Sequence, residues 1–187
     1  MKTLIYLFAI AMLLFAGCAK DEMFDDNINT PELKKAKVPI PTRSELCGVA
    51  DPTSEPILKP KPGLDPNDPK NYIPSVMIIS GKCTQMGKID SEQSYYKIEV
   101  FKLINEGGVT LIFQSGHGFL AGANGDGYYY TWWVKTSMTT FEYVGGSELQ
   151  GGTGRFEGVT GESEMSGKVD QVNNTNCWTA EGWMIYE

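Results

Sequence analysis

The chain has few residues whose types and spacing suit catalysis. His117 is its only histidine, so a Ser-His-Asp triad would have to be built on this one residue. The serines nearby, Ser115 and Ser137, lack the sharp strand-to-helix turn that exposes a nucleophilic serine. We therefore expect no catalytic residue here, and we expect His117 to lie in a turn or at the mouth of a β-barrel.

Three acidic residues could serve as a catalytic pair of carboxylates. Glu157, Glu162 and Glu164 are close in sequence, and a glycosidase uses two carboxyl groups on either side of its substrate. Glu162 and Glu164, however, are two residues apart, so they share one face of a strand. A solvated strand face is the expected interpretation, because charged side chains are mostly exposed.

Two further patterns suggest ligand loops but lack the necessary context. Asn124-Gly-Asp126 could offer oxygens to Ca²⁺, yet it has one Asp and not the repeated acidic positions of a calcium loop. The glycine-rich runs at 122–127 and 151–158 precede no helix, as a phosphate loop would require. The sequence therefore predicts turns, with no metal site and no cofactor.

The amino terminus predicts export. Lys2 precedes an uncharged apolar run, Leu4 to Ala16, that stops just before Cys18. This run is shorter than the ~20 apolar residues a membrane-spanning helix needs, so it is typical of a signal peptide. Phe15-Ala-Gly-Cys18 resembles the lipobox of bacterial lipoproteins, which implies that residues 1–17 are removed and that the Cys18 thiol is acylated, for example with palmitate.

The residues after Cys18 bear on location. Lys20-Asp-Glu22 and Asp25-Asp26 look like the signal that sends certain Gram-negative lipoproteins to the outer face of the outer membrane; a soluble acidic linker is the alternative.

The chain's formal charge is −7. An acidic chain without a basic cluster argues against nucleic acid as a partner and against electrostatic adhesion to lipid, so membrane contact is expected through the acyl chains alone.

Proline and glycine divide the rest of the chain. All ten prolines fall between Pro31 and Pro74, whereas most of the 21 glycines fall after them. Proline cannot donate to a strand ladder and favours extended chain. We therefore expect three parts: a signal peptide (1–17), a lipidated, flexible, proline-rich linker (18–73), and one folded domain (74–187).

The expected domain is all-β. Short apolar or alternating runs are separated by glycine turns such as Asn105–Gly108, Asn124–Gly127, Gly145-Gly146 and Gly151-Gly152. Along 162–170, Glu162 and Glu164 should share one face while Met165 and Val169 share the other. Eight strands are expected, at 76–80, 82–89, 95–104, 109–114, 127–135, 139–144, 155–169 and 177–186. We predict a small closed antiparallel barrel, since closure removes exposed edges.

Four segments carry a family resemblance: 81–88, 121–127, 151–161 and 182–186. They occur in the order seen in extracellular proteins similar to the allene oxide cyclase and dirigent barrels. The resemblance covers about residues 75–187 and implies an eight-stranded, calycin-like barrel; it transfers no active-site residue. Within its most specific run we expect Phe156 in the core, Arg155 paired with an acid across the barrel mouth, and turn or corner positions at Gly151, Gly152, Gly154 and Gly158.

The remaining cysteines have two possible pairings. With Cys18 lipidated, Cys47, Cys83 and Cys177 are left in an oxidising compartment. Since the first and last strands of a closed barrel are neighbours, Cys83 with Cys177 is the preferred disulfide. Cys47 with Cys83 is the rival, because spacing alone does not determine connectivity.

Aromatic side chains supply the functional hypothesis. Strand alternation must send some rings inward and some outward, and Trp and Tyr suit sugars or hydrophobic small molecules; the candidate ligand residues are Tyr128, Tyr130, Trp132, Trp133, Trp178 and Trp183. We expect a non-catalytic, surface-displayed binding module for a small hydrophobic molecule or glycan. The alternative is a small cyclase-like or isomerase-like enzyme. A filled interior with aromatics outside would favour binding, and a cavity with a buried polar group would favour the enzyme.

Overall fold

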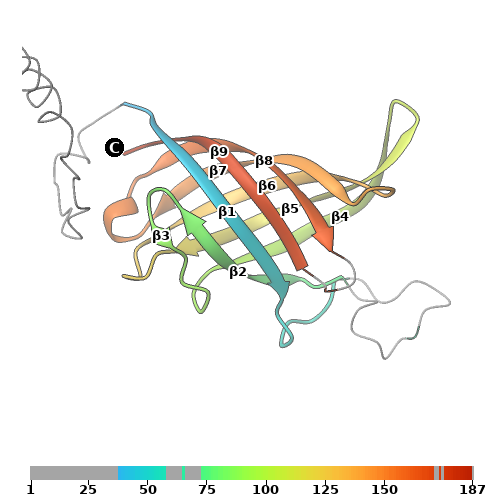
Figure 1. The fold of residues 1–187 in the computed structure, drawn as a ribbon, viewed down its shortest axis with the longest axis horizontal. Coiled ribbons are helices and arrows are strands. Elements are labelled where there is room, and N and C mark those ends of the chain that lie inside the picture. The colour runs from blue at the N-terminus through green and yellow to red at the C-terminus, as the bar shows by residue number, and fades with distance from the viewer. Residues whose placement is uncertain (1–37, 58–64, 66–72, 171–172, 174, 187) are drawn as a thin grey trace, which may run out of the picture. The chain divides into compact units, whose positions relative to one another are not determined.

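A computed structural model describes residues 38–57, 65, 73–170, 173 and 175–186. The described residues form an antiparallel β-barrel (Figure 1). Its elements are β1 (Ile40–Ala50), β2 (Val76–Cys83), β3 (Gly87–Lys88), β4 (Tyr95–Glu106), β5 (Val109–Ala121), β6 (Gly127–Ser137), β7 (Glu142–Gly152), the short 3₁₀ turn η3 (Gly154–Phe156), β8 (Thr160–Asp170) and β9 (Thr175–Ile185). None of the described residues belongs to a helix with the length and hydrophobicity needed to cross a membrane.

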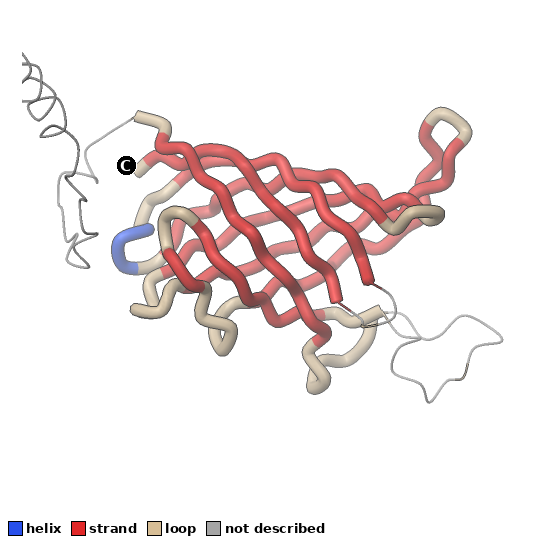
Figure 2. Tube along the Cα trace, in the orientation of Figure 1, coloured by secondary structure: helices blue, strands red, loops and turns tan. Residues whose placement is uncertain are grey.

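Strand pairing closes the sheet into a ring. The order is β1-β9-β8-β7-β6-β5-β4-β2-β3, and β1 also pairs with β2. Among the described strands β3 pairs only with β2, as a short flap beside the ring, so the ring itself uses the other eight. The tube trace in Figure 2 shows these strands wound obliquely around one interior. The expectation of a closed barrel of about eight strands is confirmed.

The strand that closes the ring comes from the expected linker. β1 lies between β2 and β9 and pairs with both, so the boundary placed at residue 74 is wrong. The error arose because the prolines of this segment were interpreted as evidence against a strand. Pro41 pairs only with Trp183 of β9, because the ladder to β2 begins at Ser44, and a strand tolerates proline where one side needs no donor.

Several turns and strand ends follow the glycine pattern, and two predicted turns do not. β2, β4, β5 and β6 begin at the expected residues, and the turns at 105–108 and 124–127 occur. Gly145 and Gly146, predicted as a turn, lie inside β7, and Gly151 and Gly152, also predicted as a turn, are the last two residues of that strand. A Cβ on Gly145 would lie 2.0 Å from the carbonyl oxygen of Trp133. Close strand approach therefore explains this glycine.

Alternation sorts the side chains of β8 as expected. Glu162, Glu164 and Lys168 are exposed, whereas Met165 and Val169 are half-buried and pack against the core. β6 alternates in the same way, with buried residues at every second position from Tyr128 to Thr136. The barrel interior is therefore the single hydrophobic core of the described domain.

One end of the barrel is closed by the β7–β8 connection. Phe156 in η3 is fully buried, and its ring lies 5.7 Å from that of Tyr128 and 6.1 Å from that of Tyr186. Gly154 and Gly158 have positive φ values of 55° and 71°, which glycine adopts without a steric penalty. The predicted core position of Phe156 and these two turn positions are confirmed; Gly151 also has positive φ.

Arg155 differs from the prediction. Instead of pairing with an acid across the mouth, its guanidinium lies 5.0 Å from the centre of the Phe156 ring, at the closed end. Its backbone N–H donates to Asp126 Oδ2 at 3.5 Å. Arg155 therefore covers the outer side of the closed end.

Candidate functional site

The six candidate aromatics divide between the two faces of the barrel wall. Four of them point inward and are at most 7% exposed: Tyr128, Tyr130, Trp132 and Trp178. Trp133 points outward and is 44% exposed. Trp183, also on the outer side, donates its Nε1–H to Glu162 at 3.3 Å. The candidate set therefore does not form one site.

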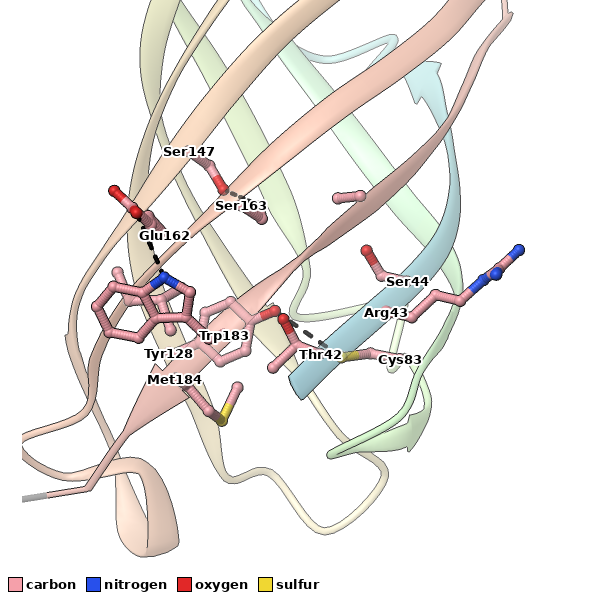
Figure 3. Close-up of a pocket in the computed structure, with 12 residues that line it drawn as sticks. Thr42, Arg43, Ser44, Cys83, Tyr128, Ser147, Glu162, Ser163, Trp183 and Met184 are labelled. Carbon is pink, nitrogen blue, oxygen red and sulfur yellow. Dashed lines mark hydrogen bonds between the residues drawn. The ribbon is translucent and has the colours of Figure 1, made fainter. Parts of the chain in front are cut away.

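The middle of the barrel is nearly full. Figure 3 shows its small polar groups: Ser147 and Ser163 share a hydrogen bond of 2.8 Å, and the Tyr128 hydroxyl lies 4.0 Å from Cys83 Sγ. The free space among the lining residues is about 30 Å³, room for about one or two water molecules. This region is a packed core with a few satisfied hydroxyls.

At the other end of the barrel, away from η3, a shallow mouth bowl remains. It is lined by Tyr96, Gln114, Tyr130, Trp132, Val134, Tyr143, Met165, Val169, Asn176 and Trp178, and its free volume is about 30 Å³. Its rim, which includes Gln114 and Asn176, is half-buried, whereas its floor is buried. The bowl therefore opens towards solvent over an aromatic floor.

A phenol–amide network crosses the mouth bowl. The Tyr143 hydroxyl donates to Asn176 Oδ1 at 2.6 Å, and Asn176 Nδ2 donates to the Tyr96 hydroxyl at 3.1 Å. Tyr96 accepts this bond, so its own O–H remains a donor. Its ring makes edge contacts with Trp132 and Trp178, at centroid distances of 5.1 and 5.9 Å.

These tyrosines are neutral at physiological pH. Burial raises the pKa of Tyr96 to about 12, although its hydrogen bond with Asn176 offsets part of the effect. Burial also raises the pKa of Tyr143, and it raises the pKa of Tyr130 well above its ordinary value. The mouth bowl therefore offers hydrogen-bond donors and acceptors without charge.

Two buried polar atoms at this end have no hydrogen-bond partner among the described residues: Trp132 Nε1 and Thr136 Oγ1. Trp132 is 7% exposed and Thr136 is 3% exposed. An unpaired buried donor costs about 1–3 kcal/mol. A bound molecule with an acceptor oxygen would recover that free energy.

An apolar surface continues from the bowl onto the β4–β5 hairpin, which extends beyond the neighbouring strands (Figure 1). Phe101 is paired with Gln114, and Leu103 with Ile112. Paired residues share a face, so these three apolar side chains lie on the same face as Gln114. Leu103 is 59% exposed, which leaves an apolar shelf beside the bowl.

The disulfide differs from both predicted pairings. Cys47 in β1 is bonded to Cys177 in β9, and the two are direct cross-strand partners. Cys83 is buried and free. The reasoning that first and last strands are neighbours was sound, but the first strand is β1 and contains Cys47. Cys83, on β2, points into the barrel and is separated from β9 by β1.

His117 also differs from the prediction. It lies within β5 and not in a turn, and its Nδ1 is 3.0 Å from Glu99 Oε1 on the outer face. The described residues contain no group of three or more His, Cys, Asp or Glu side chains placed to hold a metal ion. The sequence interpretation missed Tyr96, Tyr143 and Asn176, since nothing in their local sequence marks them as neighbours; only the sheet register brings them together.

Cys18 and the rest of the expected signal peptide lie outside the described residues. No family model matches the chain, and no curated protein matches it. Among solved structures, the chain is similar to a pterocarpan synthase dirigent protein. The TM-score is 0.44 with 11% sequence identity, and the match covers 80% of this chain and 92% of that one.

Proposed function

We propose that this protein is a non-catalytic binding module whose mouth bowl takes a small, neutral, largely hydrophobic molecule. The observation that carries the proposal is Trp132 Nε1, a buried donor without a partner among the described residues. Trp132 lines the bowl together with Tyr96, whose O–H also remains a donor. Two donors on an aromatic floor suit a carbonyl, ester or ether oxygen.

The free volume limits how the ligand sits. About 30 Å³ in the bowl accommodates only a small polar group. The apolar bulk of the ligand would lie on the shelf formed by Phe101, Leu103 and Ile112. A charged ligand is disfavoured, because no charged side chain lines the bowl and burying an unpaired charge is costly.

The chemistry of the bowl supports binding over turnover. General acid–base catalysis requires a group that exchanges a proton near the working pH, and the lining residues include neither a carboxylate nor a histidine. Its tyrosines stay protonated because burial raises their pKa values. The bowl does contain buried polar groups, the feature expected of the enzyme alternative. These groups are an indole and phenols that keep their protons, so they support hydrogen bonding to a ligand and not general acid–base catalysis.

Ligand titration of paired variants tests the proposal. Trp132 and Trp133 are adjacent on β6 but lie on opposite faces, so Trp133→Phe is a matched control. We expect a neutral, carbonyl-bearing dye such as Nile red to bind the full chain. Trp132→Phe should weaken this binding by about five- to hundredfold, corresponding to loss of a donor worth about 1–3 kcal/mol, while Trp133→Phe leaves it unchanged.

Tyr96→Phe is a second test variant, because it removes the other donor of the bowl without changing Trp132. Circular dichroism checks that each variant is folded. Equal dye binding by all of these variants would exclude the mouth bowl as the site. Appearance of a product from a neutral carbonyl compound, lost on Tyr143→Phe, would replace the binding module with an enzyme.

We also propose that the module is anchored by a lipid on Cys18 and displayed at the outer face of the outer membrane. The support is the lipobox resemblance, together with the point at which the chain enters the barrel. β1 begins at Ile40, which pairs with Met184, so the chain enters the barrel at the closed end and not at the mouth. Cys18→Ala should abolish palmitate labelling and membrane association; labelling that persists would contradict this proposal.

A further inference from the structure

We propose a second binding site, on the outer face of β5, β6 and β7, for a neutral oligosaccharide. It consists of two exposed aromatic side chains on β6, Tyr129 and Trp133, with a strip of polar side chains between them. The stacking side chains of this outer site lie on the opposite face of β6 from those of the mouth bowl, although Trp132 lines both the outer groove and the bowl.

Trp133 provides the first stacking surface. Its cross-strand partners are Ser115 on β5 and Gly146 on β7. A Cβ on Gly146 would lie 3.3 Å from the indole Nε1 and 3.6 Å from Cε2, so the indole lies over the bare backbone of Gly146. Lys135 Nζ, 5.9 Å from the ring centre, is held by Glu106 at 2.7 Å. The indole is thus supported by the sheet while 44% of the residue stays exposed.

Tyr129 provides the second stacking surface. It is 46% exposed, and its ring packs 4.7 Å from that of Phe119 on β5. Tyr129 and Trp133 are four residues apart on one strand, so they share a face and their Cα atoms are about 14 Å apart. This spacing leaves room for several sugar rings between and over the two platforms.

The strip between the platforms carries hydrogen-bonding groups. Thr131 lies midway on β6, with His117 as its partner on one side and Glu148 on the other. A β-bulge between Ile98 and Val100 re-aims Glu99, whose carboxylate reaches His117 Nδ1 at 3.0 Å. Glu148 makes no ion pair among the described residues, so its carboxylate is open to a ligand.

The groove between these groups is larger than either interior space. Its volume is about 320 Å³, and its lining includes Trp133, Thr131 and Glu148. Tyr129 does not line the groove and lies two residues beyond Thr131 on the same face of β6. Ligand pockets usually begin at about 300 Å³. The outer groove therefore has the size for a ligand that the barrel interior cannot admit.

The chemistry of the groove points to sugar. The negative face of an aromatic ring attracts the C–H groups on the flat side of a pyranose, and carboxylates accept charge-assisted hydrogen bonds from sugar hydroxyls. Aromatic platforms separated by polar side chains differ from the contiguous apolar patch of a protein interface. Glu99 and Glu148 would repel an anionic glycan, which is why the ligand is neutral.

A glycan array that presents neutral and anionic oligosaccharides to the full chain tests this inference. We expect binding to neutral glycans only, and the strongest of them is then titrated by calorimetry. Trp133→Ala and Tyr129→Ala should each weaken binding tenfold or more, and the double variant should abolish it. Glu148→Gln should weaken it only a few-fold, because the amide oxygen still accepts a hydrogen bond.

Two controls separate this site from others. Trp183→Ala removes an outer tryptophan that is hydrogen-bonded to Glu162, and Tyr96→Phe alters a residue that lines the mouth bowl and not the outer groove; neither should change glycan affinity. Absence of binding to every neutral glycan, or binding that survives the Trp133 and Tyr129 substitutions, would overturn the inference. Salt-sensitive binding of a cationic peptide that depends on Glu148 and not on Trp133 would overturn it in favour of a protein partner.

Discussion

The two ends of the barrel are built from the same kinds of residues but use them differently. At the closed end, the rings of Phe156, Tyr128 and Tyr186 pack on one another. At the mouth, Tyr96 and Tyr143 are joined through Asn176, and Trp132 Nε1 lacks a partner among the described residues. Buried polar groups cost stability unless they are paired. The closed end therefore supports the fold, and the mouth keeps groups with which it can recognise a ligand.

The disulfide fits this contrast. Cys177 follows Asn176 directly in β9, so its bond to Cys47 joins the β1–β9 seam at the mouth end. A covalent link across a sequence separation of 130 residues strongly reduces the conformational entropy of the unfolded chain. The end that contains the buried polar atoms without partners among the described residues thus also contains the covalent link.

Alkaline pH should have the largest effect, because it acts on both ends at once. The folded pKa of Tyr96 is about 12 against an ordinary value of 10.0, and burial also raises the pKa of Tyr128. Raised pKa values mean that the native state keeps protons which the unfolded state releases, so stability is full below pH 10 and falls as the pH rises towards 12. Tyr96 alone accounts for about 3 kcal/mol.

Phenolate absorbance and circular dichroism should therefore change together in an alkaline titration. Tyr96→Phe should remove one part of the pH dependence. Ionisation of the buried tyrosines while the barrel remains fully folded would contradict this expectation.

Phe156→Ala should lower the stability of the closed end without affecting ligand binding at the mouth. It empties a fully buried position, and large-to-small changes of this kind cost about 3–5 kcal/mol. Denaturant unfolding should show this loss, while dye binding at the mouth is retained. Phe119→Ala, at a half-buried outer position, is the matched control with a smaller loss. A loss below about 1 kcal/mol would mean that Phe156 does not seal the barrel.

Removing the disulfide should have the next largest effect. The Cys47→Ser, Cys177→Ser double variant should lose about 2–4 kcal/mol of unfolding free energy. Mass spectrometry of non-reduced peptides should link these two cysteines in the parent and in Cys83→Ala, which keeps the bond. A Cys83-containing disulfide in the folded protein would refute the observed connectivity.

Tyr143→Phe should have the smallest effect on stability. It removes the donor to Asn176 Oδ1 while keeping the ring, for a loss of about 1–2 kcal/mol. Tyr129→Phe, at an exposed position, should change stability by less than 0.5 kcal/mol, as is usual for surface changes. Equal effects of the two substitutions would mean that the mouth network contributes nothing to the fold.

Much of the architecture could be predicted from local sequence. Glycine turns and alternating runs placed the starts of β2, β4, β5 and β6, and alternation assigned both faces of β8. β1 was missed because Pro39 precedes it, Pro41 lies within it, and Leu46 is its one buried large apolar residue. β1 is stabilised by backbone pairing with β2 and β9. This stabilisation cannot be predicted from the residues of β1 alone.

The candidate sites were predicted only in part. Aromatic rings on both faces of the barrel wall were expected from the sequence, and β6 has Trp132 inside and Trp133 outside, since alternation along a strand is a local property. The residues that contact the aromatic rings were not predicted. Asn176 on β9 donates a hydrogen bond to Tyr96 on β4, and Gly146 on β7 lies beneath Trp133 because of the strand register. A residue becomes part of such a site only when the sheet places it there.

The sequence by itself determined the all-β class, several of the turns and the alternation of side chains along β6 and β8, because each depends on residues adjacent in the chain. Only the tertiary structure decided that β1 closes the ring, that Cys47 meets Cys177, and that an uncharged network forms at the mouth. These features depend on which strands become neighbours. That choice is made by the free energy of the whole barrel, through the burial of one shared core and the pairing of its backbone groups.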